Sequence, residues 1–395
     1  MNRVEKIFFF TVSPIISLPI TLYGIYKRSF LSLILLAFTI GVLSFLYLPT
    51  MSNDKARYFE LYNNFALYGY DYLTEHLATR SADFVIHFLI YFFAINHIPL
   101  PYLILLISTF TAGSYFYFFS KFALFSKKES FNYFLCFIIV LLSFSLPDLL
   151  SGIRFYFGTA FLILAYYFFF FSKKKLLSIC LLILAILTHF SLALFIPVFI
   201  LLYYMPNHYK LFRWMMIFSF LFILAPKQLV ISIIDTLGLS GGFETKAELY
   251  LEGEDFIEKG ITEGSQNYIW VYLFSIGWSF FAYLYLLLTV TRKSMIRNIL
   301  YCSFAIVNIF YVITTVYARY LIVLKFLFIL LLIYELIEYK NRKPLYIMLL
   351  FVIVNTISSF IILRNNLIES YLSSRIFSIV QLFANQNMDL VDFLR

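Results

Sequence analysis

The sequence predicts an all-α integral membrane protein, built as a polytopic helical bundle of about 12 transmembrane helices. Two observations lead to this fold class. Of the 395 residues, 62% are hydrophobic and 13% are charged, and the mean hydropathy is +0.88, whereas a soluble globular chain carries roughly a quarter charged residues. The apolar runs are also long and lack the alternation of outer-membrane strands, so helices are the spanning element.

Candidate spans follow from the roughly 20 apolar residues that a helix needs to cross a bilayer. Nine runs qualify as single spans, namely 7–26, 30–49, 101–120, 131–147, 153–171, 268–290, 298–316, 320–338 and 344–362. The run 176–205 is too long for one span, so we expect it to divide near His189 into two short helices. A further span is expected at 211–226.

Short basic clusters lie between these runs and predict the cytoplasmic turns. They are Lys27-Arg28, Lys127-Lys128, Lys173 to Lys175, Lys210 with Arg213, Arg292-Lys293 with Arg297, and Lys340 with Arg342-Lys343. Once the run 176–205 is divided, all of them fall on one side of the membrane. The same topology does not allow segment 84–96 to cross, so we expect a short outer-leaflet or re-entrant helix there. It also places the amino terminus outside.

Two long polar stretches, 50–83 and 227–267, then lie on the outer face of a single membrane domain that covers residues 1–395. The second stretch is strongly acidic, which suits an exterior loop. Long polar loops between spans serve as functional lids or as solvated connectors, and both interpretations stay open for these two.

Composition and motifs exclude several other classes of function. Cys136, Cys180 and Cys302 lie inside apolar runs, so they build neither a disulfide framework nor a metal-ligand spacing. The net charge of +9 is spread over short clusters between spans, which disfavours a nucleic-acid partner. There is no glycine loop followed by Lys-Ser and no His-Glu-x-x-His motif. We therefore expect no metal, no cofactor and no nucleic acid, with the bilayer as the main surroundings.

A few polar residues stand out by their depth in the membrane. A helix rises about 1.5 Å per residue. Arg154 therefore lies roughly 28 Å from Lys173, and Arg319 lies roughly 31 to 33 Å from the nearest basic turns. Both distances place the arginines at the outer boundary of the membrane. His189 lies roughly 21 Å above Lys175, about a third of the way into the bilayer from outside. Asp54 and Arg57 follow the second span and join the same face.

Each of these residues has a structural and a functional interpretation. Arg154 and Arg319 either anchor helix ends by snorkelling or clamp a diphosphate through bidentate contacts. His189 and Lys325 carry polar groups inside the bilayer, where they pack as satisfied structural residues or take part in function. Asp54, Asp148 and the acids of 227–267 are candidate general bases, and spacing does not choose among them.

The segment Ser151 to Phe195, SGIRFYFGTAFLILAYYFFFFSKKKLLSICLLILAILTHFSLALF, resembles the core of the EpsG-like branch of the Wzy-type O-antigen polymerases. In that pattern an Arg opens a span, a basic turn follows, and the next span ends in His and a small hydroxyl residue. Arg154, Lys173 to Lys175, His189 and Ser191 occupy these places. The likeness extends upstream to Asp54 with Tyr58 and Tyr62, and downstream to Tyr317-Ala318-Arg319-Tyr320. Phe155 departs from the family, which often has Gln after the first Arg.

The resemblance implies a glycosyltransferase of the GT-C-like membrane group in the bacterial inner membrane, with its active site facing the periplasm. It would polymerise undecaprenyl-diphosphate-linked oligosaccharide repeat units by transferring the growing glycan to the non-reducing end of a new unit, without a metal. Arg154 and Arg319 would clamp the diphosphate, and His189 would donate to it or carry a proton. The remaining substrate contacts would come from Asp54, Arg57, Tyr58, Tyr62, Asp148 and Lys325. Whether a chain-length regulator protein works beside it stays open.

Three other functions stay open from the sequence. A flippase for the same lipid-linked oligosaccharides would also have many spans and cationic residues in a cavity, but flipping requires access from both faces, and the unusual residues here cluster on one. An O-antigen ligase or a membrane O-acyltransferase would use outer or intramembrane Arg and His in a similar way.

Overall fold

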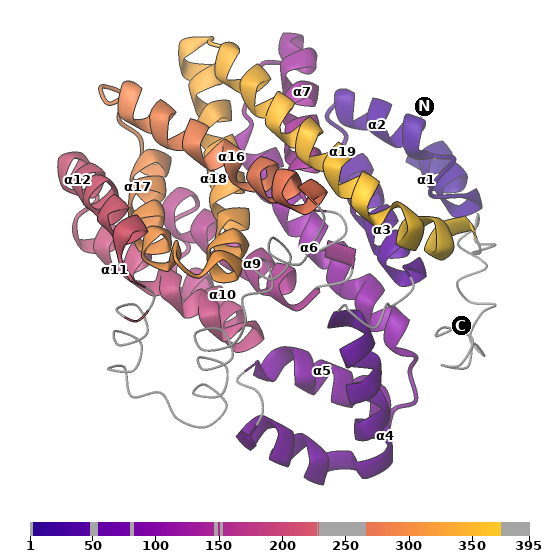
Figure 1. The fold of residues 1–395 in the computed structure, drawn as a ribbon. Helices are drawn as coiled ribbons and strands as arrows, with labels where there is room; N and C mark the ends of the chain where they lie inside the picture. The colour runs from indigo at the N-terminus through magenta and orange to yellow at the C-terminus, as the bar shows by residue number, and fades with distance from the viewer. Residues whose placement is uncertain are drawn as a thin grey trace.

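The computed structural model describes residues 3–47, 54–79, 83–145, 149–150, 153–226, 228 and 266–372. The described residues form helices joined by short turns, and none of them lies in a β-strand, so the all-α prediction is confirmed for this part of the chain (Figure 1). Within the described residues, four helical segments are long and apolar enough to cross a membrane: Leu100–Phe122, Ile153–Phe171, Thr314–Tyr339 and Lys343–Ile361. Seven more apolar helices have 10 to 17 residues, so the expected number of crossings stays a prediction.

Seven α-helices are described between residues 3 and 143. They are α1 (Arg3–Val12), α2 (Leu18–Tyr26), α3 (Phe30–Leu46), α4 (Asp54–Thr79), α5 (Phe84–Ile95), α6 (Leu100–Phe122) and, after the short turn η1 (Lys127–Glu129), α7 (Ser130–Ser143). The span expected at 7–26 is thus two helices. Pro14 and Pro19 explain the break, because proline lacks the amide hydrogen that an uninterrupted helix needs.

The second part begins with α9 (Ile153–Tyr166), which continues into the π-helical turn η2 (Tyr167–Phe171). It goes on through α10 (Lys175–Thr188), η3 (Phe190–Phe195), α11 (Ile196–Tyr204), α12 (Tyr209–Ser219), η4 (Phe220–Leu224), α16 (Gln266–Leu288), α17 (Met295–Val307), η5 (Asn308–Phe310), α18 (Thr314–Tyr339) and α19 (Lys343–Leu372). The predicted division at His189 is confirmed, since α10 ends at Thr188. The helix expected from residue 320 instead begins at Thr314. Nearly all of the acidic stretch 227–267 lies outside the described residues.

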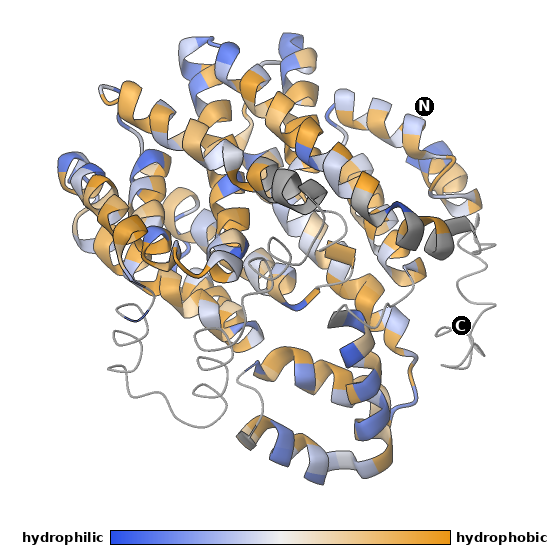
Figure 2. Cartoon of the chain, viewed as in Figure 1, coloured by the Kyte–Doolittle hydropathy of each residue, from blue (hydrophilic) through white to orange (hydrophobic). Residues whose placement is uncertain are grey.

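The core of the bundle forms around α18. In the most apolar window of this helix, 83% of the residues are buried inside the protein. Aromatic side chains from several helices surround it: Phe326 packs its ring against Tyr115 and Phe118 of α6, and Phe328 packs against Trp278 of α16. Figure 2 shows hydrophobic residues along most of the bundle helices, with hydrophilic residues concentrated near their ends.

A second, smaller core joins α4 and α5 to the bundle. It contains Tyr58 and Phe65 of α4 and Ile90 of α5, packed with residues of α6 and with Phe157 of α9. The stretch 50–83 is therefore largely helical, although it is polar enough to be expected as a loop. Helix α4 kinks at Gly69, where the backbone adopts φ 64°, a conformation that glycine reaches without a steric penalty. Figure 1 shows α4 and α5 lying together at one end of the molecule.

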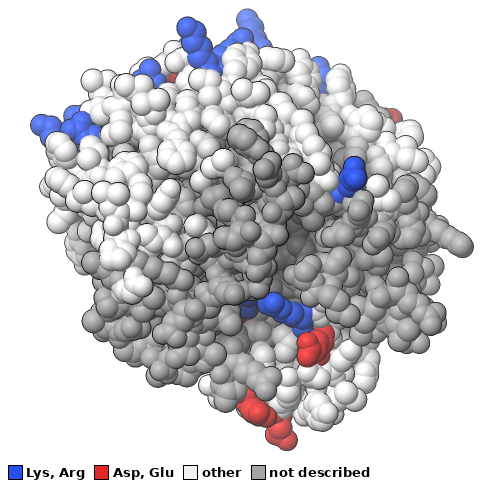
Figure 3. Space-filling model, viewed as in Figure 1, with Lys and Arg blue, Asp and Glu red and all other residues white. Residues whose placement is uncertain are grey.

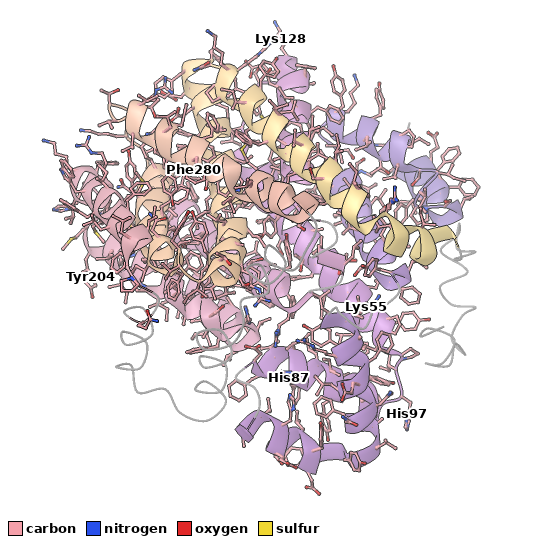
Figure 4. All side chains as sticks on the ribbon, in the orientation of Figure 1. Lys55, His87, His97, Lys128, Tyr204 and Phe280 are labelled. Atoms are coloured by element: carbon pink, nitrogen blue, oxygen red, sulfur yellow. The ribbon has the colours of Figure 1, made fainter. Side chains whose placement is uncertain are left out.

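The basic turns gather at the opposite end. The Arg28 guanidinium donates to the carbonyls of Phe125 and Ser126, which links the α2–α3 turn to the α6–α7 turn. Lys340, after α18, pairs with Glu129 of the same turn at 3.1 Å. Figure 3 shows most of the visible Lys and Arg side chains along this edge, and Figure 4 places Lys128 there and His87 at the other end. These contacts bring three of the six basic clusters together, as expected for clusters that share one side.

Candidate active site

Two of the predicted site residues meet where α9 begins and α10 ends. Arg154 is the second residue of α9. His189 follows α10 directly and has an extended backbone, with φ −151° and ψ 103°, so its side chain leaves the helix axis at the break. The helix break in the long apolar run therefore places the His189 side chain against α9. A continuous helix would have placed it on a regular helix face.

Asp83 connects Arg154 and His189, and it was missed by the sequence analysis. Its side chain has no exposed surface. One carboxylate oxygen, Oδ2, lies 2.9 Å from the Arg154 guanidinium and 3.5 Å from Nδ1 of His189. The other, Oδ1, accepts a hydrogen bond from the backbone N–H of Phe190 at 3.1 Å. A carboxylate from the α4–α5 unit thus joins α9 to the turn after α10.

Gly158 permits the close approach of α9 to this turn. It lies one helical turn after Arg154, and a Cβ placed on it would come within 2.7 Å of Leu192 Cδ1 and 3.2 Å of His189 Cβ. Real Cβ atoms essentially never show the first of these distances. A larger residue at position 158 would therefore require the Leu192 side chain to move and the His189 Cβ to give way by a few tenths of an ångström.

The start of α18 also reaches this end of the bundle. Tyr320 donates its hydroxyl hydrogen to the carbonyl of Ser191 at 3.0 Å. The Phe155 ring lies between the two regions, with its centroid 5.3 Å from the His189 ring and 6.4 Å from the Tyr320 ring. Arg319, the neighbour of Tyr320, is half-buried on α18. The structure therefore brings the helix that carries Arg319 next to the turn that carries His189, with an aromatic ring where the family often has Gln.

Lys325 lies deeper in the bundle than Arg319. It is six residues further along α18, roughly 9 Å by the helical rise, and it is buried with 7% exposure. Its ammonium lies 5.9 Å from the centroid of the Trp278 ring on α16, a cation–π arrangement. This contact helps to hold the Lys325 side chain inside the bundle. The contact between Lys325 and a substrate stays a prediction.

The predicted contacts on the first outer stretch have different surroundings. Arg57 is exposed on α4, Tyr58 is buried in the smaller core, and Tyr62 is half-buried beside it. Asp54 begins α4, but its side chain is outside the described residues, and so is all of Asp148. Their predicted roles remain predictions. The spacing of Tyr58, Tyr62 and Phe65 was the signal that could have shown this stretch to be helical.

Lys55, between two of these residues, is fully buried. Its ammonium donates to the carbonyl of Ser44 at 2.8 Å and to that of Tyr47, at the carboxyl-terminal end of α3. A cation there stabilises carbonyls that the helix leaves without partners. Burial lowers the pKa of Lys55 to about 7. This residue attaches α4 to the end of α3, and so fixes where the outer helices begin.

Two histidines lie beside Asp83 in the outer helices. His87, one turn into α5, places Nδ1 at 2.7 Å from the carbonyl oxygen of Asp83, and its ring lies 4.8 Å from that of His76 on α4 (Figure 4). Among the described residues, no group of three or more His, Cys, Asp or Glu side chains is arranged to hold a metal ion. The pair serves to pack α4 against α5 next to the Asp83 carboxylate.

Comparison with known proteins places the whole arrangement in one family. No curated protein and no solved structure matches the chain. The family model described as EpsG family matches residues 30–373, which include Asp83, Arg154, His189 and Arg319. This match covers most of the chain and agrees with the resemblance carried by the segment around Arg154 and His189. The protein belongs to the EpsG family.

Proposed function

We propose that this protein polymerises undecaprenyl-diphosphate-linked oligosaccharide repeat units, of an O-antigen or of a capsular or exopolysaccharide, on the periplasmic face of the bacterial inner membrane. Its family is consistent with a membrane polysaccharide polymerase-type function. The observation that carries the proposal is the meeting of Arg154 and His189 around one carboxylate, with the Arg319 helix beside them, at the end opposite the basic turns.

The reaction joins the growing glycan to the non-reducing end of a new unit. A sugar hydroxyl of the incoming unit attacks the anomeric carbon of the growing chain, and the bond to the lipid diphosphate breaks. Negative charge builds on the departing diphosphate, and preorganised cationic donors stabilise it there. Arg154 and Arg319 supply these donors. The Arg154 side chain is 18% exposed, so the protein does not enclose it completely.

The remaining predicted residues surround the acceptor. His189 takes the hydroxyl proton or donates to the diphosphate, and Arg57 with Asp54 shapes the acceptor pocket. Tyr58, Tyr62, Asp148 and Lys325 complete the substrate contacts in this proposal. No metal is assigned a role, because two guanidiniums suit the leaving group.

The test uses a strain that lacks this protein and receives the wild-type chain, Arg154→Ala, His189→Ala or Arg319→Ala. Surface glycan is resolved by gel electrophoresis. A polymerase defect leaves single repeat units attached to the lipid A core, so each variant should lose the ladder and keep the one-unit band. Normal ladders in all three variants would contradict the site.

Matched controls come from exposed residues of the same types. Arg342→Ala changes an arginine at the basic end, and His97→Ala changes a histidine of the α5–α6 turn, so both should keep the ladder. The same gel separates the other functions. A ligase defect leaves no unit attached to the core, and a flippase defect strands repeat units on the cytoplasmic side, where externally added glycosidase does not reach them.

A further inference from the structure

The side chain of Asp83 does not cap the helix that follows it. It occupies the N-cap position of α5, where aspartate commonly accepts a hydrogen bond from the first turn. Its side chain makes no such bond. Instead, the carboxylate points away from α5 to Arg154, His189 and the Phe190 amide, which lie 71 to 107 residues further along the chain. Capping therefore does not explain this side chain, and its contacts with the site do.

Two donors fix the orientation of this carboxylate. Arg154 binds Oδ2 at 2.9 Å and the Phe190 amide binds Oδ1 at 3.1 Å, so rotation about the Cβ–Cγ bond would break both contacts. With the plane fixed in this way, Oδ2 faces Nδ1 of His189 at 3.5 Å. This separation is longer than a good hydrogen bond, and such contacts often shorten when substrate binds.

The imidazole is also confined on its other sides. The Phe155 ring packs against it nearly perpendicularly, at 88°, and Gly158 lies below its Cβ. A histidine whose Nδ1 faces a carboxylate carries its hydrogen on Nδ1, which leaves the lone pair of Nε2 available to accept a proton. The His189 side chain keeps 6% exposure, whereas Asp83 has none, so the imidazole is the less enclosed group of the pair.

We propose that Asp83 is a positioning residue that holds His189 as the proton acceptor of the polymerisation step, an inference that rests on the proposed function. The acceptor hydroxyl oxygen forms a bond to the anomeric carbon, and the bond from that carbon to the diphosphate oxygen breaks, with its electron pair leaving on the diphosphate. The hydroxyl proton moves to Nε2 of His189. Asp83 stabilises the imidazolium that results, and Arg154 keeps the carboxylate in place.

The experiment measures chain extension by the full-length protein in proteoliposomes. The substrate is undecaprenyl-diphosphate-linked repeat units purified from the strain that lacks this protein. For Asp83→Asn we expect kcat to fall at least about 100-fold while KM stays within about threefold, because the amide can donate to Nδ1 and leave the hydrogen on Nε2. Asp83→Glu, which keeps the charge on a longer side chain, should recover about tenfold of that loss and should stay about tenfold slower than wild type. Asp71→Asn changes an exposed acid of α4 and should behave as wild type.

A double-variant cycle distinguishes this role from a structural one. If Asp83 acts through His189, the variant with Asp83→Asn and His189→Ala together is no slower than His189→Ala alone. Independent effects that multiply would overturn the proposal, as would a loss confined to KM. If Asp83→Asn does not fold, the split between kcat and KM in Asp83→Glu decides, and an unchanged kcat refutes the role. A normal rate for His189→Ala would also overturn this proposal, whereas a failure of the wild-type protein to extend chains would refute the proposed function.

Discussion

The two ends of the bundle each place one buried carboxylate between two basic side chains, and the two clusters differ in how closely those side chains contact the carboxylate. At the basic end, Glu335 of α18 accepts hydrogen bonds from Arg292, Arg297 and the Tyr285 hydroxyl. Arg297 is buried with 1% exposure and donates further to Thr289 Oγ1 at 3.0 Å. At the other end, Asp83 binds Arg154 closely but leaves His189 at 3.5 Å.

This difference indicates that the Glu335 cluster is a structural clamp and that the Asp83 cluster belongs to the functional site. The Glu335 cluster ties α16, α17 and α18 together, and each carboxylate oxygen is taken by a guanidinium. In the Asp83 cluster, by contrast, Oδ2 has one close guanidinium and a looser contact of 3.5 Å with the His189 imidazole. Buried ion pairs are costly to break from one side because the remaining charge loses its partner. We therefore expect substitutions at the basic end to affect folding and substitutions at the other end to affect catalysis.

The largest effect should follow from Glu335→Ala. It leaves Arg297 buried without its carboxylate, which should lower the free energy of unfolding by about 3 to 5 kcal/mol. Thermal unfolding of the detergent-solubilised protein, followed by size-exclusion chromatography, measures the loss. Glu338→Ala, an exposed residue one turn later on α18, is the control and should leave the unfolding temperature unchanged. An unfolding temperature for Glu335→Ala equal to that of wild type would show that the cluster is no clamp.

Arg154→Lys should produce a large loss of activity. The ammonium keeps a charge beside Asp83 but lacks the planar fork that binds a carboxylate and a phosphate together. We expect the rate of chain extension to fall about 100-fold, with an unfolding temperature close to that of wild type. The same change at the other end, Arg297→Lys, should reverse the pattern by lowering the unfolding temperature while sparing the rate per folded molecule. If Arg154→Lys and Arg297→Lys changed the rate and the unfolding temperature in the same way, the two clusters would not differ in role.

Gly158→Ala should have a moderate effect on the rate. The added Cβ would meet Leu192 and His189, so the turn must shift by a few tenths of an ångström, and we expect about a tenfold slower chain extension. Gly113→Ala on α6 is the matched control, because its Cβ would meet its nearest neighbour, Ala37 Cβ, at an ordinary 3.8 Å. That variant should retain full activity and gain up to about 1 kcal/mol from helix propensity. Full activity in Gly158→Ala would mean that the spacing between α9 and the His189 turn does not matter.

The smallest effect should come from Lys173→Gly in a basic turn. Lys173 has φ 57°, a left-handed conformation that costs a residue with a Cβ about 1 kcal/mol. Glycine should therefore raise the unfolding temperature slightly, by the equivalent of under about 1 kcal/mol, without changing the rate. Lys174→Gly, which changes a neighbour with φ −88°, should bring no such gain. A lower unfolding temperature for Lys173→Gly would show that this lysine contributes more through its charge than it costs through its backbone.

Much of this architecture follows from local patterns. The excess of apolar residues predicts membrane helices, and a run too long for one span predicts the break at His189, which the structure confirms. Basic clusters predict turns on one side, and the contacts of Arg28 and Lys340 with one turn agree. These features depend on residues close together in the sequence, where composition and periodicity are informative. The helical character of 54–79 was missed because a polar, amphipathic helix lacks the apolar length used to find spans.

The sequence by itself determined that the chain enters the membrane, where its helices divide, and which polar residues lie far from the basic turns. Only the tertiary structure decided that Asp83 meets Arg154 and His189, and that Glu335 meets Arg292 and Arg297. The physical reason is that burial requires each charge to find a partner, but many acids in the sequence could serve. The choice depends on which helices pack together, and that is set by contacts between residues far apart in the chain.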